Sequence, residues 1–424
     1  MYQALTPIYL TGKITTVNSS ILQAELPVVT TGLKCHIATT LGDIQAEIIS
    51  GKDHTAFLAP LNKAASISVG DKVFVPINCK NFINIPKIGS VVDGEGNLLL
   101  GESCCHTLSK GNLSTGNSVS SLSRPPINKK LHTKIRSIDT LLPLGYGQRI
   151  GLFAPAGAGK STLLGDLAKT ADVDITVLAL IGERGREVRE FIEDILGPDG
   201  IKKSIVVVAT SDEPAAKRRA AANYATSIAE HYRDQGKRVL LMMDSLTRFA
   251  RAVRDLAISC GEIPVRQGYP SAVYTELPVL LERAGNTETG SITAIYTVLY
   301  SGSSDADQLS EEIKSLLDGH IYLSPKIAEV GIRPAVDILR SVSRVNTKVS
   351  SNTELQQQTI LRKALARLER DKDIVMLGGK ADAELERFLL YEGELVKFLN
   401  QSESCMDVDK LSGMLTAFES CQRN

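Results

Sequence analysis

The segment Ala154–Ser161, which reads APAGAGKS, constrains the fold of this chain more than any other stretch. It follows the apolar run Ile150–Phe153 and precedes the helix-like run Thr162–Leu167. A strand, a glycine-rich turn and a helix that begins near Lys-Ser form the layout of a phosphate-binding loop. Gly157 and Gly159 allow backbone N–H groups to curl around phosphate oxygens, where a Cβ atom would collide. This order of elements predicts a nucleotide-phosphate site on an α/β sheet.

The polar residues of this loop have distinct expected roles. Lys160 can reach the β- and γ-phosphates, and the Ser161 hydroxyl can ligate Mg²⁺. The helix N-terminus adds unpaired N–H donors and a partial positive charge. Ala154 stands where the usual pattern has its first glycine, and a small residue suffices there. The loop residues expected to bind the cofactor are Ala156, Gly157, Ala158, Gly159, Lys160, Ser161 and Thr162.

Composition restricts the class of protein. A length of 424 residues indicates two or three domains. Lys+Arg and Asp+Glu both number 48, so the net charge is zero, which argues against non-specific nucleic-acid binding. The sequence shows neither an apolar run of transmembrane length nor a signal-peptide layout. Its seven cysteines have no metal-ligand spacing, so free thiols in a reducing cytoplasm are expected.

The first part of the chain alternates apolar and polar residues with period two. The alternating runs, separated by glycine turns, are Leu22–Leu26, Ile44–Ile48 and Val73–Ile77. Many short strands with tight turns predict a small N-terminal β-barrel over residues 1–85. The Ser/Gly/Asn-rich stretch Leu108–Ser123 predicts a linker within a connector over residues 86–132.

From residue 133 onward, continuous apolar runs alternate with helical stretches. The expected strands are Ile150–Phe153, Thr176–Ile181, Ile205–Ala209, Val239–Met243 and Ile292–Val298. Such runs are typical of parallel strands covered on both faces by helices, so residues 133–348 are expected to form the α/β domain of the phosphate loop. Apolar residues at helical spacing between Leu361 and Leu368 predict a helical C-terminal domain over residues 349–424.

Two acidic residues follow expected strands. Asp244 ends the run VLLMMD, where a carboxylate can hold Mg²⁺, usually through water. The alternative is a helix N-cap. Glu183 follows the strand that ends at Ile181, on the expected sheet edge of the phosphate loop, and can polarise a water for attack on the γ-phosphate. Arg184 beside it is a candidate γ-phosphate contact. A charged, solvated turn explains the spacing of these two residues equally well.

Arg344 lies in SVSR, far beyond the expected sheet. From sequence alone it is either a surface arginine or an arginine finger that enters a neighbouring subunit's site, where a guanidinium stabilises transition-state charge.

These motifs together resemble the rotary-type P-loop ATPases, and the best match is the flagellar and type III secretion export ATPases. The segments that carry the resemblance include GSVVDGEG, IGLFAPAGAGKSTLLG, ALIGERGREVREF, DSLTRFARAVRD, ELPVLLERAGN and LDGHIYLSPKIAEVGIRPAVDILRSVSRV, so it covers nearly the whole chain. The combination of GERGREV with DSLTRFA is highly specific. The resemblance implies a RecA-like central domain.

The resemblance also implies an activity and its partners. It implies a homohexameric ring that hydrolyses ATP with Mg²⁺ at the cytoplasmic face of the bacterial inner membrane. The implied partners are stator and central-stalk proteins, the export gate, chaperones and secreted cargo, without nucleic acid. It assigns Lys160 as the phosphate lysine, Ser161 as the Mg²⁺ ligand and Asp244 as the second acid. Glu183 becomes the catalytic base, Arg184 the γ-phosphate contact and Arg344 the finger acting in trans.

The chain departs from the family pattern at several places. Arg333 in GIRPA stands where the family has an aromatic residue that stacks on adenine, and the segment Met376–Lys380 lacks a second one. Arg333 is therefore expected to contact the base through its guanidinium plane, with looser or less selective binding. Gln267 replaces a usual arginine. About seven residues precede the first strand-like run, too few for a stable isolated helix like the family's stator-binding one.

Three alternatives are open. A non-catalytic ring subunit, like the α subunit of ATP synthase, matches Arg333, but the retained Glu183 favours catalysis. A ring helicase such as the Rho terminator conflicts with the zero net charge and 5% aromatic content. A proton-driven synthase subunit is the nearest related class, and DSLTRFA together with the short C-terminal domain favours the export family instead.

Overall fold

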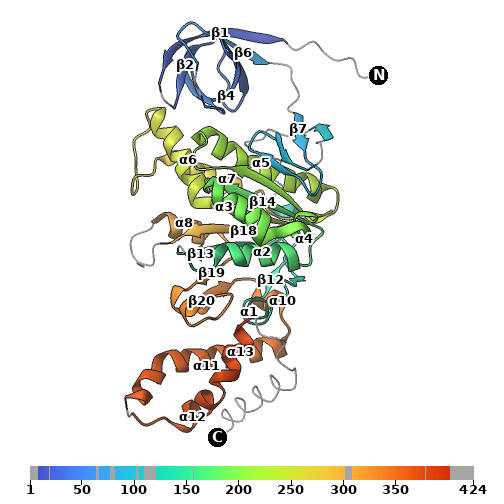
Figure 1. The fold of residues 1–424 in the computed structure, drawn as a ribbon, viewed down its shortest axis with the longest axis vertical. Helices are drawn as coiled ribbons and strands as arrows, with labels where there is room; N and C mark the ends of the chain where they lie inside the picture. The colour runs from blue at the N-terminus through green and yellow to red at the C-terminus, as the bar shows by residue number, and fades with distance from the viewer. Residues whose placement is uncertain are drawn as a thin grey trace. The chain divides into compact units, whose positions relative to one another are not determined.

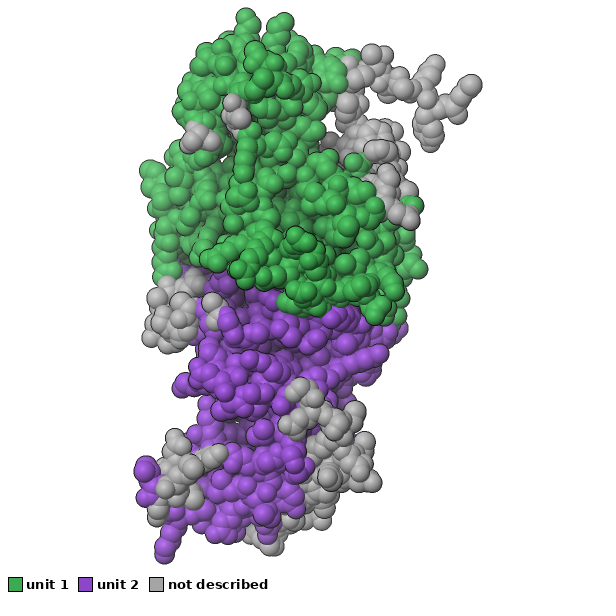
Figure 2. Space-filling view, viewed as in Figure 1, with its two compact units in different colours: residues 1–124, 174–297 green, residues 125–173, 298–424 purple. Residues whose placement is uncertain are grey.

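The computed structural model describes residues 8–18, 20–63, 66–76, 82–101, 105–108, 121–155, 157–300, 308–377 and 379–401. The chain divides into two compact units, coloured separately in Figure 2. Unit 1 comprises residues 1–124 and 174–297, and unit 2 comprises residues 125–173 and 298–424. Most of the expected linker Leu108–Ser123 lies outside the described residues, except for Leu108 and a 3₁₀ turn over Ser121–Ser123.

Six strands of unit 1 close into a small barrel in the order β1-β2-β5-β4-β3-β6 (Figure 1). They are β1 (Tyr9–Val17), β2 (Leu22–Glu25), β3 (Lys34–Thr39), β4 (Gly42–Lys52), β5 (Thr55–Pro60) and β6 (Lys72–Pro76). Neighbouring strands are antiparallel throughout. The barrel expected from the alternating runs is therefore present.

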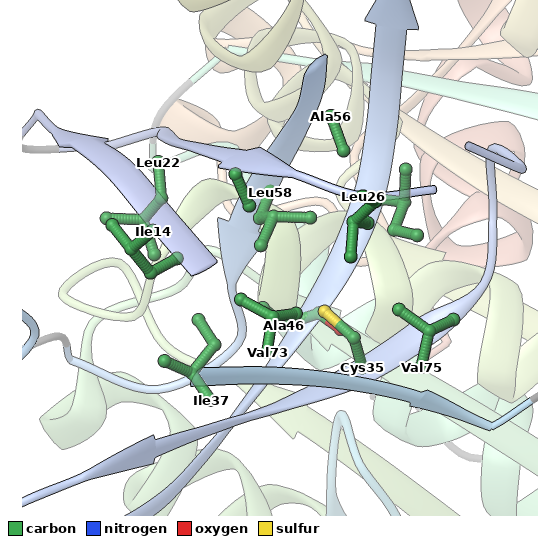
Figure 3. Packing of buried hydrophobic residues seen from close by; sticks show 12 residues of the cluster. Ile14, Leu22, Leu26, Cys35, Ile37, Ala46, Ala56, Leu58, Val73 and Val75 are labelled. Atoms are coloured by element: carbon green, nitrogen blue, oxygen red, sulfur yellow. The ribbon is translucent and has the colours of Figure 1, made fainter. Parts of the chain in front are cut away.

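The barrel encloses its own apolar core, drawn in Figure 3. Residues two apart on each strand point inward, as Leu22 and Ala24 do on β2, because side chains alternate between the faces of a strand. Cys35 is buried among them, and burial raises the pKa of its thiol to about 12. This thiol therefore behaves as a small apolar core group.

The rest of unit 1 is a mostly parallel sheet in the order β18-β16-β14-β15-β8-β9. Its strands are β8 (Val91–Asp93), β9 (Leu98–Leu100), β14 (Ile175–Ile181), β15 (Ser204–Ala209), β16 (Arg238–Asp244) and β18 (Ser291–Leu299). Strands β8, β15, β14, β16 and β18 are parallel, while β9 is antiparallel to β8 and β17 (Gly285–Asn286) to β18. A separate pair joins β7 (Phe82–Ile85) to β10 (Cys105–Leu108).

Helices connect these strands. They are α3 (Gly185–Glu190), a π-helical turn η2 (Phe191–Leu196), α4 (Gly197–Ile201), α5 (Ala215–Asp234), α6 (Leu246–Ser259) and α7 (Ser271–Leu281). Helix α5 packs across β14, β15 and β16. The barrel packs on α5 and α6 through a small apolar cluster that includes Leu61, Ala216 and Leu256. The four internal strands predicted for this unit are confirmed within one residue at each end.

Unit 2 holds the phosphate loop. Strand β13 (Arg149–Ala154) pairs in parallel with β19 (Gly319–Leu323), and β19 pairs antiparallel with β20 (Val336–Ser343). The helices are α1 (Arg136–Leu141), α2 (Lys160–Thr170), α8 (Gln308–Leu316), α9 (Pro325–Glu329) and α10 (Asn346–Val349). A short pair joins β11 (Lys130–Leu131) to β12 (Leu144–Gly145).

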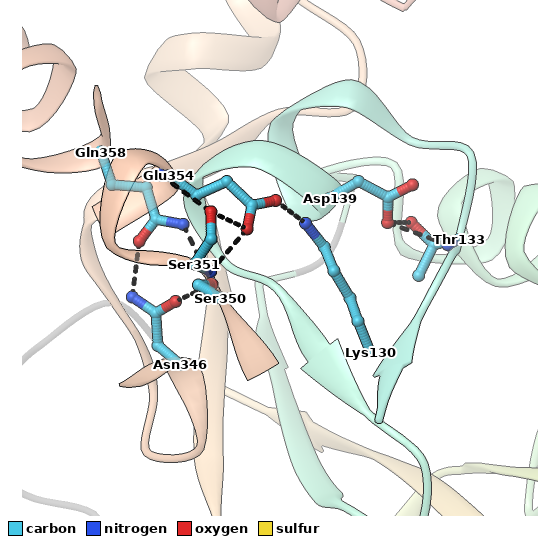
Figure 4. Close-up of polar contacts among 8 residues, drawn as sticks. All are labelled: Lys130, Thr133, Asp139, Asn346, Ser350, Ser351, Glu354 and Gln358. Atoms are coloured by element: carbon cyan, nitrogen blue, oxygen red, sulfur yellow. Dashed lines mark hydrogen bonds and ion pairs between the residues drawn. The ribbon is translucent and has the colours of Figure 1, made fainter. Parts of the chain in front are cut away.

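The C-terminal part of unit 2 is helical, as the spacing of Leu361 to Leu368 predicts. It consists of α11 (Asn352–Met376), α12 (Ala383–Leu390) and α13 (Glu392–Leu399). Helix α11 starts with a capping box: the Ser351 N–H donates to Glu354 at 2.7 Å, and the Glu354 N–H donates back to the Ser351 hydroxyl (Figure 4). None of the helices in the described ranges combines the length and apolar character that a membrane span requires.

Candidate nucleotide site

The loop between β13 and α2 has the backbone of a phosphate cradle. Gly157 and Gly159 adopt φ angles of +79° and +83°, which L-residues with side chains rarely adopt. Helix α2 begins at Lys160, directly after Gly159. A Cβ atom on Gly157 would meet no atom within 4 Å, so the backbone conformation rather than crowding within the unit requires glycine there. Ala156 lies outside the described residues.

Apolar contacts anchor both sides of this loop. Ala154, the residue that replaces the usual first glycine, is fully buried, and its carbonyl accepts a hydrogen bond from the Tyr300 N–H at 3.2 Å. Ala158 is buried, and α2 rests on Leu163, Leu164 and Leu167. Lys160 and Ser161 are half-buried, while Thr162 is exposed. The polar groups therefore remain accessible on a rigidly anchored helix start.

Arg333 lies beside this loop within unit 2. A Cβ atom on Gly159 would be 3.9 Å from an Arg333 guanidinium nitrogen. Arg333 follows the turn after α9, and its side chain is otherwise exposed. The arginine that stands in the place of an adenine-stacking aromatic residue is thus close to the start of α2.

Glu183 lies in unit 1, just beyond the end of β14. Gly182, with φ of +71°, turns the chain there, and the Gly182 N–H donates to the Ala209 carbonyl at 2.6 Å. The Glu183 carboxylate is 3.5 Å from Arg248 Nε, and their side chains are 12% and 27% exposed. Gly182 has to lack a side chain, because a Cβ atom there would lie 2.7 Å from Arg248 Cδ.

Arg248 was not among the predicted site residues. It lies on the first turn of α6, within the DSLTRFA segment, and its side chain covers the turn that carries Glu183. The sequence does place an arginine, Arg248, within the specific DSLTRFA motif. The sequence does not show that Arg248 pairs with Glu183, because 65 positions separate these two residues.

Asp244 is the last residue of β16, and it is 4% exposed. Its Oδ1 atom accepts a hydrogen bond of 2.7 Å from the Thr297 hydroxyl. The N-cap of α6 is Ser245, whose hydroxyl accepts from the Arg248 N–H. Capping is therefore the role of the serine, and the Asp244 carboxylate remains a buried acid at the carboxyl end of its strand.

The two remaining arginines are on the surface of their units. The Arg184 side chain is 78% exposed and pairs with Glu187 at 3.5 Å. Arg344 follows β20, and its N–H donates to the Asp318 carbonyl at 3.0 Å. Its exposed guanidinium makes no hydrogen bond or ion pair with any residue that the structure describes.

Ser161 and Asp244 each carry a type of oxygen ligand that Mg²⁺ accepts. Within the described ranges no three His, Cys, Asp or Glu side chains cluster as a metal cage. Mg²⁺ keeps several waters and is usually bound by one or two protein oxygens together with substrate phosphates. A hydroxyl at Ser161 and a buried carboxylate at Asp244 are ligands of that kind.

A strand, a turn with two left-handed glycines and a helix that starts with lysine and serine define the class of P-loop nucleotide-binding proteins. Within this class, residues 134–343 match the model of the ATP synthase alpha/beta family, nucleotide-binding domain. The chain is 42% identical to a flagellum-specific ATP synthase of Bacillus subtilis over 363 residues, which cover 84% of this chain and 82% of that protein. It is 40% identical to the SPI-2 type 3 secretion system ATPase of Salmonella typhimurium, covering 96% and 95%.

Solved structures agree with these relatives. The assembled ATPase EscN from the type III secretion system of enteropathogenic E. coli superposes with a TM-score of 0.86 at 37% identity, covering 96% of this chain and 99% of that one. The chain therefore belongs to the family of flagellar and type III secretion ATPases. The α/β fold and the ATPase function expected from its motifs are confirmed.

Proposed function

We propose that this chain works as a homohexameric ring that hydrolyses ATP with Mg²⁺ and drives protein export. The observation that carries the proposal is the turn with two left-handed glycines, Gly157 and Gly159, which leads into Lys160 at the start of α2. Exposed N–H groups at a helix start and a lysine favour bound phosphate. We assign Gly157, Gly159 and Lys160 to the phosphates, together with Ala156, Ala158 and Thr162 of the same loop.

In this proposal Ser161 and Asp244 hold Mg²⁺. When bound together with ATP, Mg²⁺ would neutralise negative charge on the β- and γ-phosphate oxygens. The Ser161 hydroxyl offers a direct ligand. The Asp244 carboxylate offers one through water, and the Thr297 hydroxyl fixes its orientation.

Glu183 is the proposed catalytic base. Its carboxylate accepts a proton from the attacking water as the new bond to the γ-phosphorus forms and the bond to the leaving β-phosphate oxygen breaks. Arg248, at 3.5 Å, holds the carboxylate at the end of β14. The Glu183 side chain is 12% exposed, so packing restricts its orientation while water can still reach the carboxylate.

Arg184 and Arg344 supply positive charge in the proposal. Arg184 contacts the γ-phosphate of its own subunit, which requires the exposed pair with Glu187 to open. Arg344 acts on the nucleotide of the adjacent subunit. The absence of a partner for its guanidinium among the described residues fits a group that finds its counter-charge in a neighbour.

The assembly part of the proposal rests on solved relatives. EscN has been determined as an assembled ATPase and in complex with its central stalk EscO. We propose that this chain also assembles into a ring and also binds a central stalk. We further propose that it works with stator proteins, chaperones, secreted cargo and the export gate at the cytoplasmic face of the bacterial inner membrane. Flagellum-specific and secretion-system relatives have similar identities, 42% and 40%, so either apparatus fits.

The first experiment replaces Lys160. Lys160→Ala is expected to abolish ATP hydrolysis and weaken nucleotide binding, because it removes the charge that faces the β- and γ-phosphates. Lys169→Ala, which changes an exposed lysine on the last turn of the same helix, is the matched control and should retain activity. Full hydrolysis by Lys160→Ala would overturn the assignment of the loop.

A further inference from the structure

Two residues directly after α13 connect Arg333 to the rest of unit 2. The Asn400 side-chain oxygen accepts a hydrogen bond from the Arg333 N–H at 3.2 Å. The next residue, Gln401, donates its backbone N–H to the Arg333 carbonyl at 2.6 Å. Both backbone polar groups of Arg333 are thus paired with the Asn400–Gln401 segment.

The same segment is joined to the turn that begins α1. The Gln401 side-chain amide accepts from the Arg136 N–H at 3.0 Å and donates to the Lys134 carbonyl at 3.0 Å. The Arg136 guanidinium donates to the Asn400 carbonyl. The Gln401 amide therefore both accepts a hydrogen bond from and donates one to the turn that contains Lys134 and Arg136.

That turn is itself rigid and connected to α2. The Asp139 carboxylate accepts from the N–H groups of Thr133 and Lys134 at 2.8 and 2.9 Å. The Thr133 carbonyl accepts from the Thr170 hydroxyl at 2.6 Å, on the last turn of α2. The Asn400–Gln401 segment is thereby fixed with respect to the helix that starts at the phosphate loop.

The position of the Arg333 side chain follows from this support. Consider a Cβ atom built on Gly159. Among the described residues outside the phosphate loop, only the Arg333 guanidinium lies within 4 Å of that atom. A long exposed side chain holds such a position only if its backbone is held. The backbone of Arg333 receives that support from residues 67 and 68 positions further along the chain.

We propose that Asn400 and Gln401 are positioning residues that hold Arg333 beside the phosphate loop, so that binding of the nucleoside part of the substrate depends on the end of α13. The inference rests on the proposed function, because it assumes that a nucleotide occupies the loop. A planar guanidinium stacks on the face of a base or donates to ribose oxygens, which are the nucleoside contacts assigned to Arg333 here. Loss of its support weakens contacts to the nucleoside and leaves the phosphate contacts of Lys160 intact.

The test measures KM and kcat for ATP with the full chain and its Asn400→Ala and Gln401→Ala variants. Each is expected to raise KM about three- to tenfold, as loss of one or two hydrogen bonds would, with kcat within about twofold. Asn400→Asp keeps an oxygen that accepts the Arg333 N–H and should restore KM. Gln356→Ala, an exposed glutamine on α11, is the control.

Inorganic tripolyphosphate separates positioning from general damage, because it occupies the phosphate end alone. Its inhibition constant should be the same in the wild type and in Asn400→Ala. An unchanged KM for ATP, or an equal rise in KM and in the tripolyphosphate constant, would overturn the inference. If the wild-type chain does not hydrolyse ATP, the proposed function fails. The inference can still be tested by calorimetric titration, which compares the affinities of wild type and Asn400→Ala for ADP and for tripolyphosphate.

Discussion

The hydroxyl of Thr297 on β18 donates a 2.7 Å hydrogen bond to the carboxylate of Asp244 on the adjacent strand β16. Both side chains are buried, Thr297 completely and Asp244 to 4% exposure. In a buried setting a hydrogen bond to a charged group is stronger than one in water, and this bond fixes the orientation of the Asp244 carboxylate.

Thr297→Val is therefore expected to raise the Mg²⁺ concentration needed for half-maximal ATP hydrolysis by about three- to tenfold, since the new side chain has the same shape but no donor. Thr297→Ser keeps the hydroxyl and should behave like the wild type. The measurement is ATPase rate against free Mg²⁺. Identical curves for Thr297→Val and wild type would contradict the role of Asp244.

Mixed rings test whether Arg344 acts in trans. Rings of Lys160→Ala alone or Arg344→Ala alone should be inactive. When the two variants are mixed, a site built from an intact Lys160 and a neighbour's intact Arg344 forms again, and random mixing at equal amounts restores roughly a quarter of wild-type sites. Phosphate release after co-assembly measures this. Absence of rescue at every mixing ratio would argue against a finger in trans.

Two ion pairs of Arg219 join the barrel to helices α5 and α7 within unit 1. Arg219 on α5 donates to Glu47 of the barrel at 3.0 Å and to Glu276 of α7 at 2.7 Å, and Glu47 is 7% exposed. Arg219→Met leaves a buried carboxylate without its partner and should cost about 3–5 kcal/mol of the free energy of unfolding.

Urea titration of that variant gives the measurement. Arg189→Met, which removes an exposed pair with Glu193, should cost less than about 1 kcal/mol. Equal losses in the two variants would mean that the Arg219 pairs contribute no more than surface contacts.

Acid sensitivity is expected at the start of α11, shown in Figure 4. A hydrogen bond from Lys130, at 2.7 Å, lowers the pKa of Glu354 from its ordinary 4.5 to about 2. A carboxylate with a lowered pKa in the folded state stabilises the fold fully above its ordinary pKa and loses this contribution as the pH falls. Wild type and Glu354→Gln should thus differ most in stability near neutral pH and converge toward pH of about 2.

Thermal unfolding across pH tests this expectation. Glu369→Gln on the same helix removes an exposed carboxylate that has no ion-pair partner among the described residues, and it serves as the control. A stability gap between wild type and Glu354→Gln that widens on acidification would contradict a lowered pKa for Glu354 in the folded state.

The sheet strands and the phosphate loop were predictable from sequence for a physical reason. A parallel strand buried on both faces is an uninterrupted apolar run, so Val239–Met243 predicts β16 to within one residue at each end. The glycines of the loop were equally visible, because few other residues adopt their φ angles. The barrel followed from period-two alternation.

Long-range pairings were not predictable. The connector contributes β8 to the sheet beside β15, although its run of three residues is too short to be recognised as a strand. The pairing of Glu183 with Arg248 and the support of Arg333 by Asn400 join residues far apart in sequence. Such contacts depend on how the elements pack, which local patterns do not encode.

The central claim is that Glu183 activates the attacking water, and single-turnover phosphate release by Glu183→Gln tests it most directly. Glutamine keeps the shape and cannot accept the proton, so the rate should fall by about 10²- to 10⁴-fold while nucleotide binding persists. Glu190→Gln on α3, an exposed carboxylate that pairs with Arg186 rather than with a proposed site residue, should keep the wild-type rate. Phosphate release by Glu183→Gln at the wild-type rate would contradict the claim.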